Sequence, residues 1–322
     1  MLVVSSVDLY PGSQEERLPG FTPQFPHLVS CSILDRYPQH TVPWHWHRSV
    51  ELFYIKSGAL IYYTPGGQRL FRAGSGGLVN SNVLHRTRAV ETGAESIQYV
   101  HLFEPELVTG VSGGVIEQRY VAPLLKARGL ELIGLSPEDP VQAETLALLR
   151  ESYALDETDF GYELELQAVL CRIWAGLARQ VQAQLGQTPP AVATASEKIK
   201  PMMLYIHAHL AEKLSVEQLA AAVFCSEREY YRTFRACLHT TPGEYIRNVR
   251  LQTACKLLRE TELAVTEVAR RCGLGSSSYF GAQFRQEFGC TPTEYRLKWQ
   301  NSDIRWQEND SGIPAARGTI MA

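Results

Sequence analysis

The N-terminal half of the chain carries a dense group of side chains able to bind a ligand, within Trp44–Glu51. His45, His47 and Glu51 supply imidazole nitrogens and a carboxylate, which hydrogen-bond polar ligands and coordinate divalent metal ions. Aromatic side chains nearby offer flat apolar faces to a sugar ring or an aromatic effector: Trp44, Trp46, Tyr54, Tyr62 and Tyr63. On strands the same aromatic residues can instead fill the core.

The segment Trp44–Glu51, with Gly58 beyond the glutamate, resembles the first motif of the cupin fold. The second cupin motif is present with asparagines in place of its usual proline and glycine, and its spacing is kept by Gly74, Asn80, Asn82 and His85. The resemblance implies that four residues occupy the metal-ligand positions of cupin enzymes: His45, His47, Glu51 and His85.

Three imidazoles and one carboxylate suit Zn, Fe, Mn or Ni, with one coordination position left open. In an enzyme, that open position would activate water or oxygen. The same groups can also hydrogen-bond an organic ligand, or one another, without any metal. Ligand binding, a bound divalent metal and a purely structural role are therefore three separate hypotheses for these residues.

Alternation of apolar and polar residues predicts the strands that position this group. Glu51–Lys56 and Ala59–Tyr63 alternate in this way and are separated by turn residues at Ser57–Gly58. The pattern is typical of a small antiparallel barrel or sandwich. With the cupin resemblance, we expect an N-terminal all-β cupin-like barrel for sensing a ligand over residues 1–136.

Two helical patterns follow the barrel, at residues 140–155 and 162–185, and predict a helical dimerisation element over residues 137–185. The second pattern carries a wide apolar stripe that has to be covered: Leu164, Leu166, Val169, Leu170, Ile173, Leu177 and Val181. Either a second copy of the chain or the barrel of the same chain can cover this stripe, and we favour a homodimer contact. Two prolines then indicate a stiff linker at residues 186–195.

A repeat near the C-terminus predicts two copies of one helical unit. Five residues, Ser226, Tyr230, Phe234, Pro242 and Tyr245, recur fifty residues later as Ser276, Phe280, Phe284, Pro292 and Tyr295. Each copy opens with a short apolar-periodic stretch, Val216–Val223 and then Glu267–Cys272, which is followed by a break and a second helix. This is the pattern of a helix-turn-helix written twice.

Local signals mark the starts and turns of these helices. Ser215 and Gln218 form a capping box for the first copy, Thr266 stands where the second copy needs a cap, and Gly273 supplies a tight turn. Gly243–Glu260 has no proline or glycine after its start and predicts one continuous helix about 27 Å long. A spacer of that length suits two major-groove entries roughly 34 Å apart.

The C-terminal region resembles the AraC-type transcription regulators over about residues 196–298. The residues that carry this resemblance are Arg250, Leu251, Ala254, Leu257, Leu258, Val268, Ala269, Gly273, Tyr279, Phe280, Phe284, Gly289, Thr291, Pro292, Tyr295 and Arg296. The resemblance implies an all-α DNA-binding domain over residues 196–300, with two helix-turn-helix units that bind both boxes of a promoter from one face of the duplex.

The second helix of each unit leaves one face free for DNA, because its aromatic residues form a single inward stripe. The expected DNA contacts are Ser226, Glu227, Arg228, Tyr231 and Arg232 in the first unit and Ser276, Ser277, Ser278, Gln283 and Arg285 in the second. Arg228 and Arg232 stand one turn apart, and arginine suits bidentate contact with guanine. Ala282 stands where the family usually carries arginine, so phosphate contacts and DNA shape should matter more in the second unit. A solvated helix face is the alternative interpretation of these arginines.

Composition is that of a globular protein, with 45% hydrophobic residues. The first residues lack the basic flank of a secretory signal and no apolar run is long enough to span a bilayer, so we expect a cytoplasmic location and no membrane partner. The 7 cysteines include no Cys-x-x-Cys pair, and we interpret them as reduced. Residues 301–322 show no periodicity and predict a flexible tail.

These features predict a transcription regulator controlled by a small-molecule effector, without enzymatic activity or catalytic residues. We expect its partners to be double-stranded promoter DNA, an effector that is a carbohydrate or related metabolite, a second copy of the chain, and RNA polymerase if it is an activator. Two other functions fit part of the sequence: a metal-dependent cupin enzyme whose helical domain serves assembly, and a ligand-independent DNA-binding protein.

Overall fold

The structure is a computed structural model that describes residues 1–299 except residues 5, 11, 19, 92, 128 and 183–189. The chain divides into two compact units, residues 1–204 with 232–239, and residues 205–231 with those from 240 on. The predicted tail at 301–322 and the first part of the predicted linker at 186–195 lie outside the described residues. No helix in the described part is long and apolar enough to cross a membrane.

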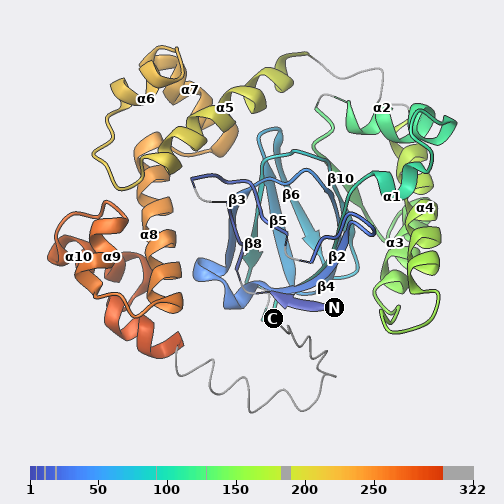
Figure 1. Ribbon diagram of the computed structural model, residues 1–322, viewed down its shortest axis with the longest axis horizontal. Coiled ribbons are helices and arrows are strands. Elements are labelled where there is room, and N and C mark those ends of the chain that lie inside the picture. Colours follow the sequence, from blue (N-terminus) through green and yellow to red (C-terminus); the bar gives the residue numbers. More distant parts are fainter. Residues whose placement is uncertain are drawn as a thin grey trace. The chain divides into compact units, whose positions relative to one another are not determined.

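Two sheets form the N-terminal unit (Figure 1), one with the strand order β1-β2-β9-β4-β7-β10 and one with the order β3-β8-β5-β6. The strands are β1 (Leu2–Val4), β2 (His27–Ile33), β3 (Thr41–His45), β4 (Val50–Ser57), β5 (Ala59–Thr64), β6 (Gly67–Arg72), β7 (Gly76–Val79), β8 (His85–Val90), β9 (Ile97–Phe103) and β10 (Leu132–Leu135). Only β1 and β2 pair in parallel among these strands. The predicted all-β domain is confirmed, and β4 and β5 are its two predicted strands.

Strand β4 has a different hydrophobic core on each of its faces. Leu52 belongs to a cluster that includes helical residues, whereas Phe53 and Ile55 belong to the cluster between the two sheets. Successive residues of a strand point to opposite faces, so one strand can serve both clusters. Glu51 therefore points to the same side as Phe53, into the barrel.

Helices cover the outer face of the six-stranded sheet. The helical segments up to Val181 are η1 (Leu34–Arg36), η2 (Pro38–His40), α1 (Glu106–Thr109), η3 (Glu117–Val121), α2 (Ala122–Leu125), α3 (Pro140–Ser152) and α4 (Tyr162–Val181). Helices α3 and α4 lie side by side along that sheet (Figure 1). Asp139 starts α3 because its carboxylate accepts the N–H groups of Val141 and Gln142.

The apolar stripe of α4 is buried within its own chain. Five of its residues are covered, in the core that α3, α4 and the sheet share: Leu166, Leu170, Ile173, Leu177 and Val181. Leu164, in contrast, is 73% exposed. Packing against the barrel of the same chain, the second of the two alternatives, therefore accounts for most of the stripe. These residues need no second copy of the chain to cover them. The homodimer stays a prediction.

Two buried histidines join the sheet to α3. His27 Nε2 lies 2.9 Å from His101 Nδ1, and His101 Nε2 lies 2.8 Å from Ser152 Oγ. Ser152 Oγ donates its own proton to the carbonyl of Leu149, so His101 Nε2 must donate to Ser152 and His101 Nδ1 must accept from His27. His101 is therefore neutral in this arrangement. Burial lowers the pKa of His27 from 6.5 to about 4.

Acid should destabilise the barrel through this histidine pair. The folded pKa of His27 is lower than its unfolded value, so the stabilisation is complete above about pH 6.5 and is lost as the pH falls toward 4. The expected loss of unfolding free energy is about 3 kcal/mol. Urea unfolding of the wild type and His27→Gln at pH 7 and pH 4.5 measures it, because the glutamine amide can still donate to His101 without titrating. Equal losses in the two proteins would contradict this account.

Helices make up the described part of the C-terminal region: α5 (Pro190–Ala208), α6 (Val216–Ala222), α7 (Glu227–Leu238), α8 (Pro242–Glu260), α9 (Val265–Arg271) and α10 (Ser277–Phe288). The capping box of Ser215 and Gln218 is confirmed at α6. A second box, Thr241 with Glu244, starts the long helix α8, whose continuity was predicted. Gly273 has a φ of 63°, as the predicted tight turn requires.

Two local predictions in this region differ from the structure. Thr266 is not a cap, because α9 already begins at Val265 and its N-cap residue, Ala264, makes no side-chain cap bond. The apolar residues Val268 and Ala269 are fully buried, and packing of this face outweighs the missing cap. Helix α5 begins at Pro190, inside the predicted linker, since proline is well tolerated in the first turn of a helix.

Candidate functional site

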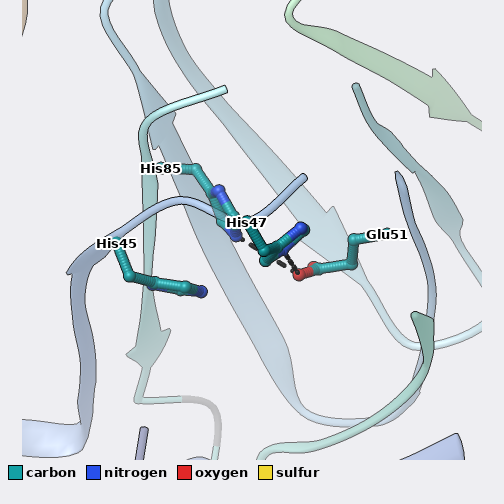
Figure 2. A group of neighbouring side chains, drawn as sticks. All are labelled: His45, His47, Glu51 and His85. Atoms are coloured by element: carbon teal, nitrogen blue, oxygen red, sulfur yellow. Dashed lines mark hydrogen bonds and ion pairs between the residues drawn. The ribbon is translucent and has the colours of Figure 1, made fainter. Parts of the chain in front are cut away.

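Four residues, from three strands of the barrel and one loop, converge on one point. His45 ends β3 and pairs directly with His85 at the start of β8, while Glu51 lies on β4 and His47 precedes it in the connecting loop. All four side chains are buried, and their ligand atoms lie within 4.8 Å of one another. Figure 2 shows the three rings directed at the Glu51 carboxylate from different sides. We call these four residues the tetrad.

Backbone carbonyls fix the protonation of the three rings. The Nδ1 atoms of His45, His47 and His85 lie 2.8, 2.8 and 2.9 Å from the carbonyl oxygens of Pro43, Ser49 and Val83. A carbonyl can only accept, so each Nδ1 carries a proton and a neutral ring presents the lone pair of Nε2. This is the outer-shell arrangement by which proteins orient metal-binding histidines.

The centre of the tetrad consequently attracts positive charge. The carboxylate oxygen Oε2 of Glu51 lies 3.2 Å from His85 Nε2 and 3.4 Å from His47 Nε2, as the dashed lines of Figure 2 mark. His47 Nε2 is buried without a hydrogen-bond partner among the described residues. Lone pairs that face a carboxylate repel it unless a proton or a metal ion lies between them. The donor set and its orphaned nitrogen therefore fit a divalent transition metal.

Burial and mutual charge set the pKa values of the tetrad. Burial, followed by the neighbouring rings of His85 and His47, holds the pKa of His45 well below its ordinary value. Burial alone would raise the pKa of Glu51, but His85 and His47, when protonated, outweigh it by their charge and their hydrogen bonds and lower this pKa instead. Tyr62 also donates a hydrogen bond of 3.0 Å to Glu51 Oε1 and orients the carboxylate.

A fifth polar side chain, Glu16, lies beside the tetrad. The backbone of its segment pairs with Trp46, since the Glu16 N–H donates to the Trp46 carbonyl and the Trp46 N–H donates to the Gln14 carbonyl. Glu16 Oε2 comes within 3.8 Å of His45 Nε2. Burial, and then the charge of Glu51, raises the pKa of Glu16 to about 8. No sequence signal indicated Glu16, because it belongs to no motif and reaches the site only by a contact with distant residues.

Two cavities meet at Glu16. An inner cavity of about 70 Å³ is lined by Glu16 together with His45, Glu51 and His85. An outer cleft of about 460 Å³ is lined by Glu16 together with His47 and Arg48. Sites for organic ligands usually occupy 300–1,000 Å³, so the inner cavity suits an ion or water molecules and the outer cleft suits a small metabolite. Glu16 forms part of the wall of both.

Of the aromatic residues predicted as ligand contacts, Tyr62 reaches the tetrad through its hydrogen bond to Glu51. The Arg86 guanidinium lies over the Trp44 ring, with its carbon 5.3 Å from the ring centre. Trp44 precedes His45 on β3, and Arg86 follows His85 on β8. Tyr54 packs against the helix-covered core, on the opposite face of β4 from Glu51. Strand alternation explains why neighbours in sequence face apart. The linings of the inner cavity and the outer cleft include none of four predicted ligand contacts: Trp44, Trp46, Tyr54 and Tyr62.

The second helices of the two repeats present polar faces. Tyr230, Phe234, Phe280 and Phe284 are fully buried, as the inward stripes require. Nine of the ten predicted DNA contacts are exposed: Ser226, Glu227, Arg228, Tyr231, Arg232, Ser276, Ser277, Ser278 and Arg285. Gln283 is half-buried.

Two of the predicted DNA contacts, Ser226 and Ser276, also cap helices. The hydroxyls of Ser226 and Ser276 accept the N–H groups of Glu229 and Tyr279, each at 3.2 Å. They start α7 and α10 and so hold the exposed residues in place.

Comparisons with known proteins agree with this two-part architecture. A family model described as an AraC-like ligand binding domain matches residues 27–173, and one described as a helix-turn-helix domain matches residues 219–298. The chain belongs to the AraC family of transcriptional regulators. This AraC-family chain thus has a ligand-binding domain that holds the tetrad and a DNA-binding domain that holds α7 and α10.

Individual relatives of this AraC-family chain are named as regulators. It is 27% identical over 258 residues to an uncharacterized HTH-type transcriptional regulator, YdeC of Bacillus subtilis (strain 168), covering 79% of this chain and 86% of the relative. It is 25% identical over 270 residues to the HTH-type transcriptional activator RhaS of Klebsiella pneumoniae (strain 342), covering 84% and 92%. Among solved structures, ToxT of Vibrio cholerae is 15% identical over 85% of this chain and 98% of its own, with a TM-score of 0.44.

Proposed function

We propose that this AraC-family regulator binds paired promoter boxes in a sequence-specific manner, under the control of a small polar effector held in its barrel. The observation that carries the proposal is the tetrad, with its inner cavity and the outer cleft that meets it at Glu16. A purely structural cluster needs no cleft of about 460 Å³ beside it. Imidazoles and carboxylates accept and donate hydrogen bonds to hydroxyl groups, so a carbohydrate or related polyhydroxyl metabolite is the effector we propose.

The outer cleft supports this class of effector by its composition. Its lining combines the carboxyl groups of Glu15, Glu16 and Glu104 with the guanidinium of Arg48 and the rings of Tyr10 and Phe21. Charged and hydroxyl-bearing groups around apolar ring faces suit a compact ligand with several hydroxyls. Neither Trp44 nor Trp46 lines the cleft, so these polar groups, and not stacked tryptophans, are its proposed contacts.

Selection of bound duplexes from a random DNA pool tests the DNA-binding part. We expect enrichment of paired boxes about ten base pairs apart, with affinity that falls as salt rises. Melting temperature against a panel of sugars, sugar acids and aromatic acids tests the effector part. A shift with a polyhydroxyl compound that also changes operator affinity would support the proposal. Shifts with aromatic acids alone would contradict the effector class.

We also propose that the tetrad holds a divalent transition metal ion. Three observations favour it: the protons fixed on Nδ1, the convergence of three Nε2 atoms with a carboxylate, and the orphaned Nε2 of His47. When bound, the ion would offer an open coordination position to an oxygen of the effector. The protein's own residues would hold the ion, with Tyr62 orienting Glu51 and the backbone carbonyls orienting the rings.

A further inference from the structure

Phe224, in the turn between α6 and α7, is a bulky residue in a backbone conformation that favours glycine, and its ring is exposed. Its φ is 55°, in the left-handed region, which is unfavourable for a bulky residue. Its side chain is 99% exposed, so no apolar burial offsets this strain. The Phe224 N–H donates to the Ala221 carbonyl at 3.1 Å, so the backbone of the turn holds this conformation, while the ring gains nothing from it within the domain. An exposed bulky ring at a strained position is a reason to look for an external function.

The second repeat shows that the turn itself does not need the ring. The Cys225 N–H donates to the Ala220 carbonyl at 3.0 Å, and the Leu274 N–H donates to the Ala269 carbonyl at 2.9 Å, so the two turns close in the same way. Gly273, with a φ of 63°, takes the position of Phe224 in the second turn. The first repeat therefore has a phenylalanine at the position where the second repeat has a glycine.

The position of Phe224 relative to α7 points to DNA as the partner of this ring. It lies two residues before Ser226, which caps α7, and three before Glu227, where the helix begins. Residues at the N-terminal end of a recognition helix contact base edges in the major groove. The apolar group that base pairs present in the major groove is the C5-methyl of thymine, which phenylalanine can contact.

We propose that Phe224 contacts a thymine methyl group at the edge of the first half-site and adds a sequence preference to the first repeat. The inference rests on the proposed DNA-binding function and deepens it. Arg228 offers hydrogen bonds to guanine, whereas the ring of Phe224 offers none and distinguishes thymine by contact alone. The second repeat, with Gly273, lacks this contribution.

Replacing Phe224 with Asn tests the proposal, because asparagine tolerates the left-handed region. We expect the melting temperature of Phe224→Asn to equal or exceed that of the wild type, while its affinity for the selected operator falls about tenfold, or about 1.4 kcal/mol. Deoxyuridine in place of each thymine of the first half-site removes only the methyl group. One such replacement should lower the operator affinity of the wild type and leave the operator affinity of Phe224→Asn unchanged.

Phe160→Asn is the matched control, since Phe160 is a fully exposed ring in the N-terminal unit. It should bind the operator as the wild type does. The proposal is overturned if Phe224→Asn binds as tightly as the wild type, which would indicate a protein partner for the ring. A lower melting temperature for Phe224→Asn would also overturn it, by showing a structural role. If the wild type selects no operator, the proposed function itself is wrong, and this inference fails because it rests on that function.

Discussion

Replacing both Arg228 and Arg232 with alanine is expected to weaken binding to the selected operator by about a hundredfold or more. Both side chains are exposed on α7, one helical turn apart. Each bidentate contact with guanine is worth about 1–3 kcal/mol, so losing two removes roughly 2–6 kcal/mol. Titration of the variant against the operator and against scrambled DNA, at matched salt, measures the loss of affinity and of specificity.

The matched control is the double substitution of Arg172 and Arg179, two exposed arginines on α4. It removes the same charge from the ligand-binding domain and should change operator affinity little. A loss that is equal for operator and scrambled DNA would mean that Arg228 and Arg232 contact phosphates, because phosphate contacts carry no sequence information. The assignment of base reading to the first repeat would then be wrong.

Glu51→Gln is expected to lower the affinity of the barrel for Co²⁺ or Zn²⁺ by at least about a hundredfold. Loss of an outer-shell partner already costs 10–100-fold, and a direct ligand matters more. The glutamine oxygen can still accept the hydrogen bond from Tyr62, so the side chain keeps its place while its charge is lost. Metal content of the purified protein and the visible absorption of the Co²⁺ form measure the effect without DNA or effector.

Glu15→Gln is the control for this experiment. Glu15 precedes Glu16 in the same segment, faces Arg48 at 3.4 Å and is not a member of the tetrad. It should bind metal as the wild type does. Equal metal affinity in Glu51→Gln and the wild type would exclude a tetrad centre, and the four residues would then serve the effector or the fold directly.

Metal binding and effector binding can be separated. Glu16 lines both the inner cavity and the outer cleft, and the tetrad residue His47 also lines the cleft. An effector that shifts the melting temperature of the metal-free protein as strongly as that of the loaded protein would bind in the cleft alone. An effector that requires the metal would use both spaces.

Local periodicity and spacing in the sequence were enough to predict several parts of this protein. The duplicated helix-turn-helix, the capping box at Ser215, the continuous helix α8 and the strands β4 and β5 all follow from patterns within a few turns or strand lengths. The tetrad was also predictable, because its residues carry a motif resemblance whose spacing reflects the fold.

The pairing of surfaces within the fold, in contrast, could not be predicted from these patterns. The tertiary structure placed Glu16 at the site, turned Trp44 away from His45, and covered the apolar stripe of α4 with the chain's own sheet. Such outcomes depend on contacts between residues far apart in the chain, and a pattern that shows an apolar stripe does not say what packs on it. Phe224 is a further example. Its unfavourable φ is recognised only when the backbone angles of the two turns are compared.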